Sequence, residues 1–114
     1  MFGDVARVFG ERDAERRLAA IREIYAADAT LHEPEYSSQG HEAISQAVTG
    51  LLGHLPPDFA FHAVRPALGH NGVGRLQWRG GKVGEVPAVT GLDVAHVEEG
   101  LIRTLHVFLD QPGA

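Results

Sequence analysis

Two carboxylic acids in this sequence stand in settings that suit proton transfer. Asp93 lies between Leu92 and Val94 in an apolar run, where a carboxyl group loses most of its water. Burial disfavours the charged form, so we expect Asp93 to be protonated near neutral pH. Glu33 ends an extended run directly before Pro34. Two carboxyls whose surroundings separate their pKa values can serve as acid and base, so both are candidate catalytic residues.

Arg103 offers a competing explanation for Asp93, because an ion pair would hold the acid in its charged form. The register of the strands decides between the two. With a turn centred on Glu98-Glu99-Gly100, Asp93 lies opposite a residue near Leu105 or His106, and Arg103 is at least one pair away. We therefore favour the neutral acid, with a structural pair as the alternative.

The strand that carries Asp93 belongs to a predicted β-hairpin over residues 89–110. Its two runs of β-branched and apolar residues are joined at a glycine, Gly100, which suits a short connection. Both runs are apolar on both faces, which predicts a central position in a sheet. One apolar face of the hairpin points outward, carrying either Leu92 and Val94 or the residues that alternate with them, and an exposed apolar face of this kind usually binds a partner. The simplest partner is a second copy of the chain, so we expect a homodimer.

Helices are predicted before the strands. A short helix is expected over residues 2–9, a second from Asp13 to about residue 27, and a third over 42–52. In the second helix Leu18, Ile21 and Tyr25 share the buried face. Its other face carries Arg16, Arg17 and Glu23 and is expected to be solvated.

Extended segments follow at residues 59–68, 73–79 and in the hairpin, after the broken run over 29–40. Helices followed by antiparallel strands indicate an α+β domain, with N-terminal helices packed on a curved antiparallel or mixed sheet. Such a sheet forms a cone with an internal pocket. The length of 114 residues suits one domain, residues 1–114.

The composition excludes several classes of site and partner. The chain has no cysteine, which excludes thiolate ligands and cysteine nucleophiles, and its net charge of −5 argues against nucleic-acid binding. No apolar stretch is long enough to span a membrane and the start lacks a signal-peptide pattern, so we expect a cytoplasmic protein.

Neither a metal nor a cofactor is expected. His32-Glu33 and His41-Glu42 each begin like a zinc signature, but Tyr36 and Ser45 stand where the second histidine should be. The glycines near residue 72 fit turns, because no helix follows them to form a nucleotide-binding loop.

Two segments resemble a known family. Residues 29–34, followed by Gly40 and the helix from Glu42, resemble a segment of ketosteroid isomerase. Residues 91–94, followed by 99–102, resemble that family's hairpin. Trp78 and the closing run 107–110 are similar to the wider SnoaL-like polyketide cyclase group. All of these belong to the nuclear transport factor 2-like superfamily, whose fold is an α+β cone.

The resemblance places Glu33 at the position of the isomerase's general base. It places Asp93 at the position of the protonated acid that donates a hydrogen bond to the enolate oxygen. The family's oxyanion tyrosine, in its first helix, has no match, because the region offers only Val5 or Phe9. Two other tyrosines, at positions 25 and 36, are the possible substitutes.

The resulting hypothesis is a small enzyme that binds a hydrophobic carbonyl compound in the cone and moves a proton on it, as an isomerase or a cyclase does. Beside Glu33 and Asp93, the expected substrate-binding residues are Tyr36, Phe61, Trp78, Leu105 and Val107. The alternative is a ligand-binding or structural member of the same superfamily without turnover. A pocket filled by its own side chains would favour that alternative.

Overall fold

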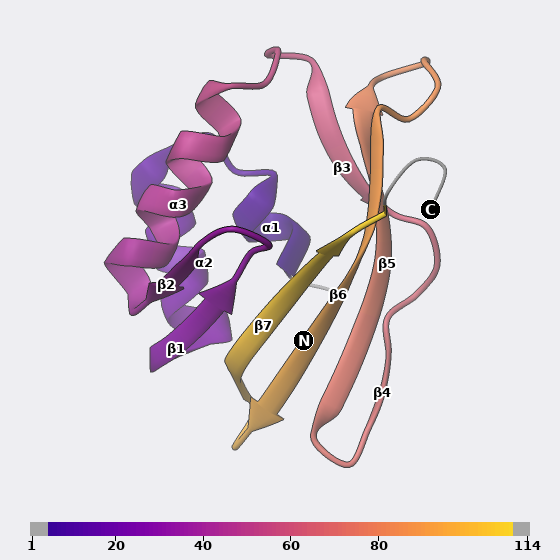
Figure 1. The fold of residues 1–114 in the computed structure, drawn as a ribbon. Helices are drawn as coiled ribbons and strands as arrows, with labels where there is room; N and C mark the ends of the chain where they lie inside the picture. The colour runs from indigo at the N-terminus through magenta and orange to yellow at the C-terminus, as the bar shows by residue number, and fades with distance from the viewer. Residues whose placement is uncertain (1–4, 111–114) are drawn as a thin grey trace.

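The structure is a computed structural model, and it describes residues 5–110. Three helices lie on one side of a curved sheet (Figure 1). The helices are α1 (Val5–Phe9), α2 (Ala14–Ile24) and α3 (His41–Gly53). The strands are β1 (Tyr25–His32), β2 (Ser37–Gln39), β3 (Phe59–Ala63), β4 (Leu68–His70), β5 (Val73–Lys82), β6 (Val89–Glu98) and β7 (Leu101–Leu109). This arrangement confirms the predicted α+β cone.

The sheet is mixed, as expected. Its order is β2-β1-β7-β6-β5-β3, and β4 pairs with the free part of the β5 edge. The pairing of β1 with β7 is parallel, whereas the remaining pairs are antiparallel. The parallel pair places His32, at the end of β1, opposite His106 of β7. It brings the end of β1, and hence Glu33, next to the central hairpin.

Helix α2 ends earlier than its periodicity predicts. Asp13 caps the first turn, accepting hydrogen bonds at Oδ1 from the backbone N–H groups of Glu15 and Arg16 at 2.9 and 3.1 Å. The helix ends at Ile24, and Tyr25 is already extended and begins β1. The prediction that Tyr25 is helical was therefore wrong, because pairing with β7 outweighs the apolar periodicity.

Arg17 is the second correction in this helix. Its side chain is only 1% exposed, although the sequence placed it on the solvated face. The guanidinium donates hydrogen bonds to the Ser45 hydroxyl at 3.2 Å, to the Glu11 carbonyl at 2.7 Å and to the Thr49 hydroxyl. Arg17 thus joins α2 to α3 through neutral oxygens.

The hairpin turn lies where the sequence placed it, at Glu99 and Gly100, both of which have positive φ angles of 52° and 81°. A bulge between His96 and Val97 shifts the register by one residue, so that Asp93 lies opposite Val107. The residue opposite Asp93 is therefore one position beyond the predicted 105–106, because the bulge shifts the register. Along β6 the inward side chains are buried, whereas Leu92 and Val94 point outward and are half-buried.

None of the helices between residues 5 and 110 is long and apolar enough to cross a membrane.

Candidate functional site

A cavity of about 200 Å³ lies inside the cone, between the helices and the inner face of the sheet. Its walls are almost entirely apolar, and Glu33 and Asp93 both line it. The lining residues are Phe9, Glu33, Pro34, Leu51, Leu55, Phe59, Phe61, His62, Ala63, Leu76, Trp78, Val89, Asp93, Val107 and Leu109. No lysine or arginine is among them. The structure therefore brings the two predicted acids to one apolar space.

Asp93 is held on the inner face of β6 and is 5% exposed. The Trp78 indole Nε1–H donates a hydrogen bond to Asp93 Oδ1 at 2.9 Å. Desolvation raises the pKa of Asp93 to about 7, although the hydrogen bond from Trp78 lowers it in part. The pKa shift has the direction that the sequence predicted.

Arg103 does not pair with Asp93. Its guanidinium contacts Asp28 at 3.2 Å and Glu98 at 3.4 Å, on the exposed side of the hairpin. Arg103 is the extra residue of the bulge opposite His96 and Val97, so it does not follow the alternation that turns Leu105 and Val107 inward. The alternative of a structural pair between Arg103 and Asp93 is therefore excluded, because Arg103 pairs with Asp28 and Glu98 instead.

Glu33 occupies the loop between β1 and β2. Its backbone N–H donates a hydrogen bond to the Tyr36 carbonyl at 2.8 Å, which closes the loop and fixes the residue at the cavity. The side chain is half-buried, and desolvation raises the pKa of its carboxyl. A carboxylate that is partly stripped of water is a stronger base than one in bulk solvent, as a general base requires.

Aromatic rings form one wall of the cavity. Phe61 packs edge-to-face against Phe59, with ring centroids 5.2 Å apart, and against Trp78 at 5.5 Å. Gly80 on β5 leaves room for the two phenylalanine rings, since a Cβ there would lie 2.8 Å from Phe59 and 2.9 Å from Phe61. The wall is therefore apolar and built of closely packed rings.

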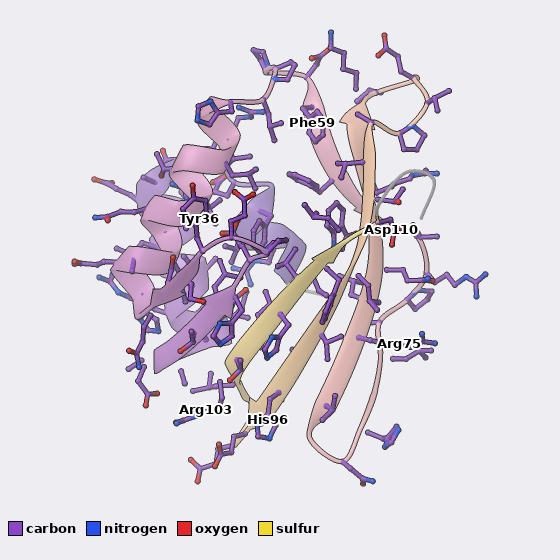
Figure 2. All side chains as sticks on the ribbon, viewed as in Figure 1. Tyr36, Phe59, Arg75, His96, Arg103 and Asp110 are labelled. Carbon is purple, nitrogen blue, oxygen red and sulfur yellow. The ribbon has the colours of Figure 1, made fainter. Side chains whose placement is uncertain are left out.

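Two of the expected substrate-binding residues are not at the cavity. Tyr36 is 71% exposed, because the loop that carries it turns its side chain toward solvent (Figure 2). Leu105 is fully buried in the core, where it lies opposite Ala95 deeper in the cone. The other three, Phe61, Trp78 and Val107, line the cavity.

Sequence reasoning missed several lining residues. Phe9, Leu51 and Leu55 come from α1, α3 and the turn after α3. Their apolar side chains indicated that they are buried. The local sequence pattern does not distinguish a residue that lines a cavity from one that fills the core. Phe9 was noted only as a possible match to the family's tyrosine, and it supplies a ring without a hydroxyl.

Tyr25 has a buried hydroxyl without a hydrogen-bond partner in the described part of the chain. Desolvation raises the pKa of this phenol, and the charge of Asp93 raises it further. Tyr25 does not line the cavity, so it does not take the place of an oxyanion tyrosine there.

Within residues 5–110, no group of three or more histidine, aspartate or glutamate side chains lies close enough together to hold a metal ion.

Comparison with solved structures shows the same fold in several bacterial proteins. A SnoaL-like protein from Agrobacterium tumefaciens, provisionally named an isomerase, has a TM-score of 0.86 and 23% identity, over 94% of this chain and 92% of that one. A protein from Kribbella flavida, provisionally named a ketosteroid isomerase, gives 0.70 and 15%, over 95% and 73%. A protein from Sinorhizobium meliloti, provisionally named a polyketide cyclase, gives 0.69 and 16%, over 91% and 93%.

No curated protein sequence matches the chain significantly. The family model for the SnoaL-like domain matches residues 5–105, which is most of the chain and includes both acids of the cavity. The protein therefore belongs to the SnoaL-like domain family.

Proposed function

We propose that the protein is an enzyme that binds a small neutral carbonyl compound in the cavity and transfers a proton on it. The observation that carries this proposal is the placement of Glu33 and Asp93 on one apolar cavity, each with a pKa raised by burial. Glu33 removes a proton from the carbon next to the carbonyl and returns it to another carbon. Asp93, protonated, donates a hydrogen bond to the oxygen on which negative charge develops.

The charge and volume of the cavity restrict the substrate. No lysine or arginine lines it, so an anionic ligand would meet the carboxylate of Glu33 without a permanent positive charge to compensate. A cavity of about 150 Å³ holds benzene, so about 200 Å³ suits a ligand of one or two rings. A four-ring steroid would have to extend through the mouth. A compact ketone is therefore the favoured substrate.

The experiment uses 2-tetralone, a neutral two-ring ketone, in deuterated buffer, with NMR detection of exchange at the carbon next to the carbonyl. We expect Glu33→Gln to lower the exchange rate by about 10² to 10⁴-fold, because the base is lost while the shape of the side chain is kept. Glu35→Gln, an exposed acid in the same loop, is the matched control and leaves the rate unchanged. An unchanged rate in Glu33→Gln would remove Glu33 from the mechanism.

A protein that binds without turnover is the second candidate. The cavity has Phe9 in its lining and lacks Tyr25, so no tyrosine hydroxyl is placed to stabilise an oxyanion there. Asp93 is then the one predicted oxyanion donor, which favours this candidate. Binding of 2-tetralone, followed by calorimetry, without any exchange above the buffer rate would support it. A further ligand, 2-naphthoate, tests the charge argument in either case, since we expect it to bind at least tenfold more weakly than 2-acetylnaphthalene.

We also propose that a second copy covers the outer face of the sheet. Leu92 and Phe108 are paired on this face, and Phe108 is 54% exposed. Arg75 extends on the same side, away from the helices (Figure 2). Light scattering at micromolar concentration should give twice the mass of the chain, and Phe108→Ser should shift it toward the monomer. A monomer mass for the unmodified protein would end this proposal.

A further inference from the structure

The Trp78 indole crosses from β5 onto β6. Trp78 lies opposite Gly91 in the strand register, and its Nε1–H reaches Asp93, two residues further along β6, at 2.9 Å. Leu76 is the residue that directly faces Asp93. The hydrogen bond therefore runs diagonally across the pair of strands, and it requires the indole to lie close against the β6 backbone.

Gly91 makes this close approach possible. A Cβ at position 91 would lie 2.3 Å from Cζ2 and 2.7 Å from Cε2 of Trp78, and 2.5 Å from the carbonyl oxygen of Phe108. These separations are far inside van der Waals contact, so any side chain at this position would displace the indole. The need for glycine here is one of space, since the backbone does not adopt a positive φ at this position.

The indole hydrogen bond distinguishes the two oxygens of Asp93. An indole N–H only donates, and the carbonyl oxygen of a neutral carboxyl group is a better acceptor than its hydroxyl oxygen, so the contact favours Oδ1 as the carbonyl oxygen. The proton then resides on Oδ2. We propose that Trp78, seated on Gly91, is a positioning residue that turns the O–H of Asp93 toward the cavity. Its effect on catalysis rests on the proposed function, but the arrangement itself does not.

Other titratable groups near Asp93 must be separated from it in any test. Glu33 and His62 line the same cavity, and the charge of Asp93 raises the pKa of Tyr25. Trp78, in contrast, carries no titratable group, and it is the one tryptophan in the chain. Its indole N–H therefore gives a single NMR resonance, identified without further assignment, that reports on its hydrogen-bond partner.

The first measurement follows this resonance as the pH is raised. When Asp93 ionises, its hydrogen bond with the indole becomes charge-assisted and shorter, so we expect a downfield shift of the N–H proton with a midpoint near pH 7. The shift should disappear in Asp93→Asn and persist in Glu33→Gln. A resonance in the unmodified protein that does not move while the Asp93 carboxyl titrates would overturn the proposal.

Two variants then test the space at Gly91 and the N–H group of Trp78. In Gly91→Ala the indole should lose its response to pH, whereas Gly50→Ala, on the open surface of α3, should keep it. If Gly91→Ala does not fold, Trp78→Phe still decides the question, because it retains a ring but removes the N–H. The pKa of Asp93, read from its carboxyl carbon resonance, should rise in Trp78→Phe, since the hydrogen bond lowers it in the unmodified protein. An unchanged pKa would overturn the proposal.

The catalytic consequence is measured separately. With 2-tetralone, we expect Trp78→Phe to lower kcat about tenfold, the effect of one misdirected hydrogen bond, and to change KM much less. Phe59→Leu alters the same aromatic wall without contacting Asp93 and should change KM more than kcat. Because the NMR measurements need no substrate, failure of the proposed enzyme activity would leave them interpretable. A Trp78→Phe variant with altered KM alone would overturn the positioning role.

Discussion

Arg17 and Asp93 are both buried, yet the structure surrounds them differently. Arg17, between α2 and α3, donates hydrogen bonds to three neutral oxygens, which replace part of the water that its charge loses on burial. Asp93, in the cone, accepts one hydrogen bond from Trp78 and otherwise faces an apolar cavity. A buried cation with hydrogen bonds to several segments holds those segments together. A buried neutral acid with one hydrogen bond, beside a cavity, keeps its O–H available to a ligand.

The largest expected effect concerns activity. Asp93→Ala removes the donor to the developing oxyanion, and we expect the exchange rate of 2-tetralone to fall by about 10² to 10³-fold. Arg17→Met should leave the rate per folded molecule unchanged, because Arg17 does not line the cavity. Rates are compared at equal concentrations of folded protein, determined by circular dichroism. Equal losses in the two variants would contradict the distinction between the two buried groups.

The second prediction concerns the pH dependence of stability. Folded Asp93 keeps its proton up to about pH 7, whereas the unfolded chain loses it near 3.8. Between these values the folded state binds more protons, so the free energy of unfolding decreases as the pH rises, by an amount on the order of 4 kcal/mol at most. Glu33 acts in the same direction, because its pKa is also raised.

Urea unfolding at intervals between pH 4 and pH 8 measures this dependence. The decrease should be much smaller in Asp93→Asn, which does not titrate. Glu35→Gln, at an exposed acid, should retain the full decrease. A stability of Asp93→Asn that changes with pH as much as that of the unmodified protein would contradict the raised pKa of Asp93.

The sequence predicted Asp93 better than Arg17, and the reason is physical. A strand buries alternate residues, so an acid between two apolar neighbours in a buried hairpin has few ways to reach water. An arginine on a helix has a long, flexible side chain, and its partners Ser45 and Thr49 lie on another helix. No local pattern encodes a contact of that kind.

The cavity was predictable only in outline. The resemblance and the order of elements indicated a cone, but the volume depends on which side chains fill it. Leu105 packs into the core, and Tyr36 points to solvent, although both have types suited to a pocket. The hydrogen bond between Trp78 and Asp93 depends on the strand register and on the space above Gly91, which appear only when the sheet is assembled.

The third prediction concerns the stability of the helix pair. Arg17→Met keeps an apolar stem of similar length but leaves the Glu11 carbonyl and two hydroxyls without their donor. We expect the free energy of unfolding to fall by about 2 kcal/mol. Arg16→Met, on the exposed face of the same helix, is the matched control and should change it by less than about 0.5 kcal/mol. If Arg17→Met lowers the free energy of unfolding no more than the control does, the hydrogen bonds of Arg17 do not stabilise the helix pair.

The smallest expected effect isolates one of the hydrogen bonds of Arg17. Thr49→Val preserves the shape of the side chain and removes the hydroxyl that accepts from the guanidinium. We expect a loss of about 1 kcal/mol in the unmodified background, because one acceptor of a buried charge is removed. In the Arg17→Met background the same change should cost much less, since the donor is already absent. This coupling in a double-mutant cycle, measured by urea unfolding, is the sharpest test of the Arg17 network. Equal costs in the two backgrounds would mean that Thr49 contributes independently, and the charge of Arg17 would then be solvated by the remaining two oxygens alone.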